Sequence, residues 1–79
     1  MATRFVLNPP IDADEFDRRY SIPQHIEHRI VRSDNEAVVD AITIDTDGEG
    51  EILAVEQELR YAFEHCTPTI ERSVPLDAQ

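Results

Sequence analysis

An apolar stripe of helical period near the end of the chain constrains the fold more than any other feature. Its members succeed one another by three and four positions, which is the spacing of a single helix face. They are Ile52, Val55, Leu59, Ala62 and Cys66. The stripe predicts an amphipathic helix over residues 51–66 that ends before Thr67–Pro68 and buries this face against a second layer.

Proline-bounded apolar runs at either end of the chain predict strands. Residues 4–7 form a short run that is apolar after Arg4 and is followed by Pro9 and Pro10, which interrupt a regular ladder. Residues 69–74 are closed by Pro75 and predict a last strand.

A short helix is predicted over residues 13–20. Asp12 has the position of an N-cap and Glu15 that of the capping-box acid, while Ile11 and Phe16 match the hydrophobic staple. The helix ends before Ser21–Pro23, because the residue before a proline disfavours helical dihedral angles.

Residues 24–45 fit two interpretations. The period of two over residues 26–31 and the β-branched content of residues 37–45 predict a hairpin with a turn at residues 33–36, which is the preferred interpretation. The alternative notes two capping-box patterns, starting at Ser21 and Ser33, and gives a mostly α fold with helices at 13–20, 22–32, 34–43 and 51–66.

With the hairpin, the order is strand, helix, two strands, helix and strand. This order predicts a small ferredoxin-like (βαββαβ) α+β sandwich with an antiparallel sheet and two helices. The 79 residues are expected to form a single domain with an ordered core over about 3–75 and a short polar tail at 76–79.

The negative charge is concentrated in residues 33–59, called here the acidic segment. It carries nine acidic side chains and no basic one, while the rest of the chain has eight acids against seven arginines. A field of one sign repels nucleic acid and favours basic partners. Lysine is absent, so a salt-adapted organism is the competing explanation, and it predicts acids over the whole surface.

These charges predict a protein-binding surface. Acids at positions 45, 47, 49 and 51 would lie about 6.6–6.8 Å apart in an extended chain, close to two nucleotide rises of about 6.8 Å. The predicted partner-binding residues are Asp34, Glu36, Asp40, Asp45, Asp47, Glu49, Glu51, Glu56, Glu58 and Tyr61.

The predicted function is a non-enzymatic inhibitor that presents a DNA-mimicking carboxylate surface to a basic groove of a nucleic-acid-handling protein. Small acidic phage proteins, including inhibitors of CRISPR effector complexes, are similar in size and charge. We expect no cofactor, no direct nucleic-acid contact and no membrane contact, and a homodimer is compatible with so small a core. One cysteine excludes an internal disulfide and favours the cytoplasm, which is the host cytoplasm if a phage encodes the protein.

A calcium-binding module is the first alternative. Residues 45–56 match the ligand spacing of an EF-hand loop, with Gly48 for the sharp turn. The candidate ligands are Asp45, Asp47, Glu49, Glu51 and Glu56. Glu49 departs from the usual Asp or Asn at the fifth loop position, and there is no second loop.

A small oligomeric ferredoxin-like enzyme or assembly subunit is the second alternative, with a histidine as its base. The sequence has no nucleophile elbow and no phosphate-binding glycine loop to support catalysis. His25, His28, His65 and Cys66 would form a zinc site only in the helical interpretation, because a strand directs His25 and His28 to opposite faces.

Overall fold

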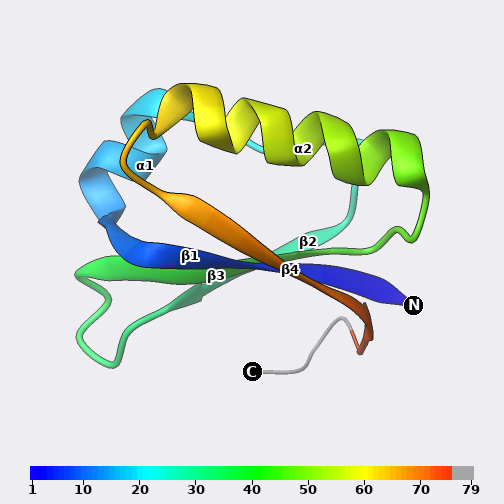
Figure 1. Cartoon of the computed structure of the whole chain (residues 1–79). Helices are drawn as coiled ribbons and strands as arrows, with labels where there is room; N and C mark the ends of the chain where they lie inside the picture. The colour runs from blue at the N-terminus through cyan, green and yellow to red at the C-terminus, as the bar shows by residue number, and fades with distance from the viewer. Residues whose placement is uncertain (76–79) are drawn as a thin grey trace.

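The structure is a computed structural model, and it describes residues 1–75. Its elements are β1 (Ala2–Asp12), α1 (Ala13–Arg19), β2 (His28–Arg32), β3 (Val38–Ile44), α2 (Glu49–Ala62) and β4 (Thr67–Val74). The four strands form one antiparallel sheet in the order β2-β3-β1-β4, and both helices cover the same face of it (Figure 1). The predicted α+β sandwich is therefore confirmed, and the mostly α alternative is wrong.

The strand order interleaves the two βαβ halves of the chain. β3 lies between β1 and β2, and β1 lies between β3 and β4, so each half is split by one strand of the other. This order is compatible with the split βαβ arrangement expected from the sequence.

A β-bulge in β3 explains how Asp40 is accommodated in a mostly buried strand. Val31 pairs with Ala41, but the next residue, Arg32, pairs with Val39, so Asp40 is the extra residue. The bulge reverses the alternation of side chains, and Val39 is buried with Ile42 on the helix side. Asp40 itself is only partly buried.

β1 is longer than predicted, because it continues beyond Pro9 and Pro10 to Asp12. Its register with β3 shifts between Val6 and Ile11, so the prolines lie in the irregular part of the ladder. After the shift the strand still buries Ile11.

Both helices form where the sequence indicated, with shifted ends. The Asp12 carboxylate accepts a hydrogen bond from the Glu15 N–H at 3.1 Å, which confirms the predicted N-cap of α1. α2 begins at Glu49 and ends at Ala62, earlier than expected. Phe63 and Cys66 lie in the turn that follows and are still buried, so the apolar stripe extends beyond the end of the helix.

The hydrophobic core lies between the sheet and the helices. Phe5, Leu7 and Ile42 contribute from the sheet, and α2 contributes Ile52, Val55 and Leu59. The rings of Phe16 and Phe63 stack with centroids 5.7 Å apart, which joins α1 to the end of α2. No helix among residues 1–75 is long and apolar enough to cross a membrane.

Candidate functional site

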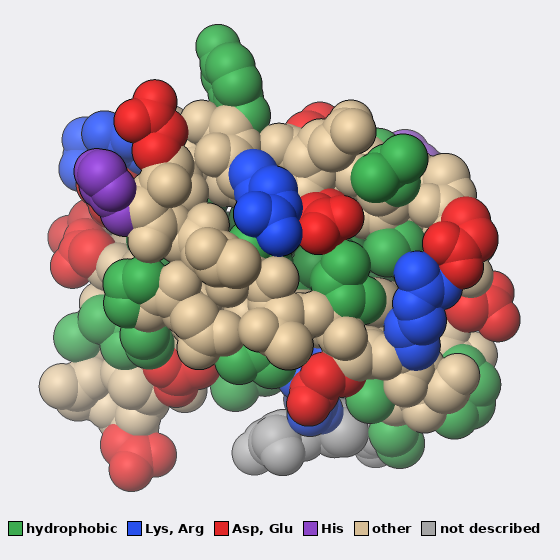
Figure 2. Space-filling view, viewed as in Figure 1, with side chains coloured by type: hydrophobic (Ala, Val, Ile, Leu, Met, Phe, Trp, Pro, Cys, Tyr) green, Lys and Arg blue, Asp and Glu red, His purple; other side chains and the backbone are tan. Residues whose placement is uncertain are grey.

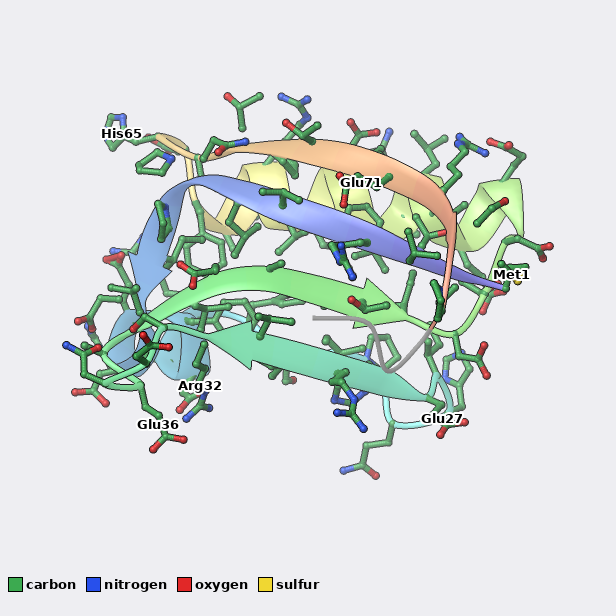
Figure 3. All side chains as sticks on the ribbon, turned by 90° about the horizontal axis from the view of Figure 1, so that it is seen from below. Met1, Glu27, Arg32, Glu36, His65 and Glu71 are labelled. Carbon is green, nitrogen blue, oxygen red and sulfur yellow. The ribbon has the colours of Figure 1, made fainter. Side chains whose placement is uncertain are left out.

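The acidic segment does not form a continuous surface. Asp34 and Glu36 lie in the turn before β3, and Asp45 and Asp47 follow β3 at its other end. Seven residues of strand separate the two ends by roughly 23 Å. Figure 3 shows the same separation, with Glu36 and Glu27 at opposite ends of β2. The structure thus divides the segment into two clusters.

The first cluster, called here the α2-end cluster, surrounds the connection from β3 to α2. The Asp45 N–H donates to the Glu27 carbonyl at 2.7 Å, which brings Glu27 beside the acidic segment. Its members are all exposed: Glu27, Asp45, Asp47, Glu49 and Glu51. Glu27 was not predicted, although the hairpin register would have placed it opposite Asp45.

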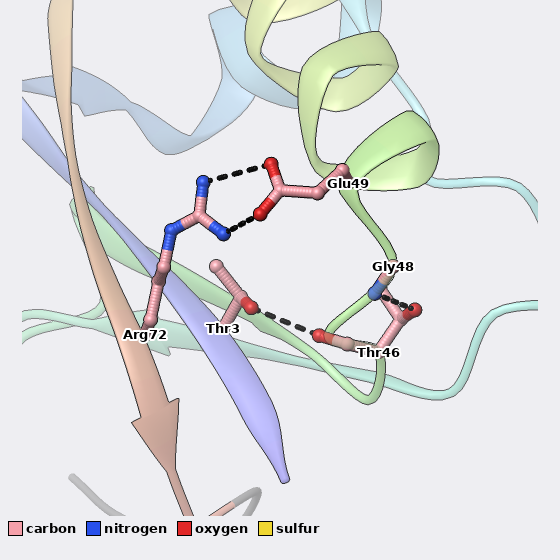
Figure 4. A network of polar contacts seen from close by, with 5 residues as sticks. All are labelled: Thr3, Thr46, Gly48, Glu49 and Arg72. Carbon is pink, nitrogen blue, oxygen red and sulfur yellow. Dashed lines mark hydrogen bonds and ion pairs between the residues drawn. The ribbon is translucent and has the colours of Figure 1, made fainter.

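Three hydrogen bonds, two of them partly buried, hold the backbone of this corner in place. The hydroxyl of Thr3, which is fully buried, donates to the Thr46 carbonyl at 2.9 Å (Figure 4). The Thr46 hydroxyl accepts from the Gly48 N–H at 3.1 Å and donates to Glu51 at 2.7 Å. Gly48 is the N-cap of α2 and has no side chain, so Thr46 provides a hydroxyl at this helix start instead. Asp45 and Asp47 flank this fixed residue.

Two carboxylates of the α2-end cluster, Glu49 and Glu51, have partners within the protein. Glu49 forms a bidentate ion pair with Arg72 of β4, in which Nη2 lies 3.1 Å from Oε2. The hydrogen bond and charge of Arg72 lower the pKa of Glu49, and Glu49 raises the pKa of Arg72. Because Glu49 and Glu51 lie in the first turn of α2, the expected extended row of four carboxylates is wrong.

The second cluster, called here the hairpin cluster, joins the β2–β3 turn to the start of α1. The Ala13 N–H donates to the Ala37 carbonyl at 2.9 Å, so the first turn of α1 lies against the hairpin. The cluster consists of Asp12, Asp14, Asp34 and Glu36. Sequence reasoning missed Asp12 and Asp14 as members because this contact joins distant parts of the chain.

The remaining predicted residues lie on β3 and α2. Glu56 forms an ion pair with Arg60 at 3.3 Å, and Glu58 accepts from the Tyr20 hydroxyl at 3.3 Å. Burial, followed by the charge and hydrogen bond of Glu58, raises the pKa of Tyr20. Tyr61 is 89% exposed, and Asp40 lies in the β3 bulge.

The geometry of residues 45–56 does not support the calcium alternative. Glu49 is directed at Arg72, Glu51 at Thr46 and Glu56 at Arg60, so the candidate ligands do not converge. The helix also begins at the fifth position of the supposed loop. Among residues 1–75 no three His, Cys, Asp or Glu side chains are grouped so that they could hold a metal ion.

The zinc combination is not assembled either. His65 lies at the opposite corner of the molecule from Glu27, the neighbour of His28 (Figure 3). Cys66 is buried as expected, and this burial raises the pKa of its thiol. A raised pKa disfavours the thiolate, which is the metal-binding form.

Comparisons of the chain with protein-family models, curated proteins and solved structures find no match.

Proposed function

We propose that this protein is a non-enzymatic binding protein that docks its α2-end cluster on an Arg- and Lys-rich surface of another protein. The observation that carries the proposal is that Glu27, Asp45 and Asp47 are exposed and have no ion pair among residues 1–75. Five of the chain's seven arginines form ion pairs, one with Glu49 of the cluster and four outside it. These carboxylates are therefore available to an external cation.

The fixed corner around Thr46 favours this use of the cluster. Binding by a preorganised surface loses less conformational entropy than binding by a loose one. The Thr3–Thr46 hydrogen bond restrains the chain between Asp45 and Asp47 before any partner arrives. The electrostatic contribution speeds encounter and sets orientation.

Apolar side chains near the cluster supply further contacts. Leu53 follows Glu49 by one helical turn and is 52% exposed, and Tyr61 lies two further turns along α2. Exposed aromatic and aliphatic side chains of this kind are the usual anchors of an interface. The proposed docking face thus runs from the α2-end cluster along the exposed side of α2.

The finer form of the proposal is that the partner handles nucleic acid and is inhibited when its phosphate-binding groove is occupied. Grooves built for phosphates are rich in Arg and Lys, and carboxylates satisfy the same donors. The size and charge of the chain are in keeping with such an inhibitor.

The first test measures binding of a nona-arginine peptide by fluorescence anisotropy at low salt and at about 0.15 M salt. Asp45→Lys/Asp47→Lys changes the α2-end cluster, and Asp34→Lys/Glu36→Lys makes the same change of charge in the hairpin cluster. We expect the first variant to weaken binding roughly tenfold or more at low salt and the second to keep most of it. Equal losses in both variants would show that only net charge matters and would contradict the proposal.

The second test addresses the partner class. The wild-type protein and the Asp45→Lys/Asp47→Lys variant are immobilised and exposed to a lysate of the encoding organism or its host. We expect a protein that binds the wild type alone, that is released by salt and that duplex DNA displaces. A partner that DNA does not displace would remove the nucleic-acid part of the proposal and leave the docking surface in place.

A further inference from the structure

The outer edge of β2 is the second unoccupied surface of the molecule. β2 is one of the two edge strands of the sheet, with Glu27 before its start and Glu36 beyond its end (Figure 3). A groove of about 520 Å³ follows this edge and is lined by residues 29–34 and Glu36. Among residues 1–75 no strand pairs with this side of β2.

Two hydrogen bonds reveal which backbone groups point into this groove. The Glu27 carbonyl accepts from Asp45, and the Ser33 N–H donates to Val38, so residues 27 and 33 both bond toward β3. Along an antiparallel strand, every second residue directs its backbone N–H and C=O groups toward the same neighbouring strand. The extra residue of the bulge lies in β3, so this alternation is uninterrupted in β2. The N–H and C=O groups of His28, Ile30 and Arg32 therefore point away from the sheet.

The strand itself carries two arginines and no acidic side chain, whereas Asp34 and Glu36 line the groove beyond its end. Arg29 has no ion pair among residues 1–75, and the ion pair of Arg32 is a long one, 4.0 Å to Asp17 of α1. Together with His28, these residues give three of the five positions of β2 a basic side chain. Unpaired edges template the addition of another strand, and the charge determines which strand fits.

We propose that the free edge of β2 accepts an extended acidic peptide segment as a fifth strand. A second copy of β2 is a poor occupant, because it carries the same two arginines and no acidic side chain to pair with them. An acidic segment complements both arginines. This surface adjoins the α2-end cluster at Glu27 but does not include Asp45 or Asp47, so the inference is independent of the proposed function.

The positions of the arginines determine the spacing of acids in the peptide. Arg32 is directed toward α1 through its contact with Asp17. Arg29 is three positions away in the same strand, so its side chain lies on the other face of the sheet. A matching segment therefore carries two acidic residues three positions apart, one over each face.

The test uses a capped peptide of sequence Thr-Val-Glu-Val-Thr-Glu-Val and measures amide hydrogen exchange of the protein by NMR. We expect the amides of His28, Ile30 and Arg32 to exchange quickly in the free protein and to become protected when the peptide binds. Arg29 and Val31 are internal references that are protected in both states. Two control peptides replace both glutamates by lysine or place them two positions apart, and both should bind more weakly.

A double arginine variant and a pair of His28 variants separate the contribution of charge from that of backbone pairing. Arg29→Ala/Arg32→Ala should weaken peptide binding by roughly 2- to 30-fold. His28→Pro removes an outward N–H without removing a β2–β3 bond, whereas His28→Ala keeps that N–H. Of the two His28 variants, the proline variant should reduce binding more than the alanine variant.

Three outcomes would overturn the proposal. The first is peptide binding that leaves the three amides unprotected, and the second is equal binding of the lysine peptide. The third is protection of the three amides in the free protein that increases with its concentration, which would assign the edge to a second copy of the chain.

Discussion

The hydrogen bond that fixes the corner of the α2-end cluster can be tested by making the same substitution, Thr→Val, at two buried threonines. Thr3 and Thr43 are both fully buried in the sheet. The Thr3 hydroxyl donates to the Thr46 carbonyl, whereas the Thr43 hydroxyl has no hydrogen-bond partner among the described residues. Thr→Val replaces a hydroxyl by a methyl group of similar size, so the two variants differ mainly in the hydrogen bond that is lost.

The magnitudes follow from those environments. Thr3→Val removes a hydrogen bond and leaves the Thr46 carbonyl without this donor, which lowers the free energy of unfolding by about 1–3 kcal/mol. Thr43→Val relieves a buried, unpaired hydroxyl, so we expect a change between zero and a gain of about 1 kcal/mol. The two variants should therefore differ by about 2 kcal/mol.

Urea unfolding measured by circular dichroism gives both values. With a slope of about 1 kcal/mol per molar urea for so small a domain, the midpoints should lie about 2 M apart, with Thr3→Val the lower. Thr3→Val should also speed amide exchange at Asp47 and Gly48, next to Thr46. A Thr3→Val protein as stable as Thr43→Val would refute the argument that this hydrogen bond fixes the corner.

Three further predictions concern the rest of the fold. The raised pKa of Tyr20 means that the folded protein holds the phenol proton above about pH 10, whereas the unfolded chain releases it. The free energy of unfolding should therefore fall by at most about 1.4 kcal/mol per pH unit above that value. In alkaline urea titrations this fall should be less steep in Tyr20→Phe and as steep as in the wild type in Tyr61→Phe. Glu36 has a φ of 58°, which a residue without a Cβ adopts at lower cost. The free energy of unfolding should therefore be about 0.5–1 kcal/mol higher for Glu36→Gly than for Glu36→Ala, which keeps the strained Cβ. Equal urea midpoints of the two variants would contradict this. Leu59 is 1% exposed, so Leu59→Ala should lower the free energy of unfolding by about 3–5 kcal/mol, whereas Leu53→Ala on the exposed side of α2 should change it by at most about 0.5 kcal/mol in thermal or urea melts.

The sequence predicted those parts of the fold that depend on local pattern. The period of α2 and the cap at Asp12 were readable because they involve neighbours within one or two turns. The β-branched residues of 37–45 favoured a strand over the capping box at Ser33, and β3 bears this out. The capping-box pattern failed because burial in the sheet outweighed a local helix start.

What the sequence did not predict depends on contacts between distant residues. The β3 bulge arises from the pairing of Val31 and Arg32 with β3, which no local pattern reports. The continuation of β1 past Pro9 depends likewise on the shifted pairing of Ile11 with Val39. The long-range contacts of Glu27 and Asp12 decide which acids gather at each end of the sheet.

The distribution of charge in space changes what the acidic segment means. Acidic side chains appear at several separate places on the face seen in Figure 2, interleaved with arginines, rather than in one patch. The concentration of acidic residues in one segment of the sequence is therefore not by itself an argument against salt adaptation, which also places acids on many elements.

The property that separates the α2-end cluster from a merely solvated surface is local. Glu27, Asp45 and Asp47 have no arginine partner among residues 1–75, and Asp45 and Asp47 adjoin a backbone that the buried Thr3 holds in place. A solvated surface needs carboxylates but does not need them fixed, so the rigidity of this corner, rather than the number of its charges, favours docking on a partner.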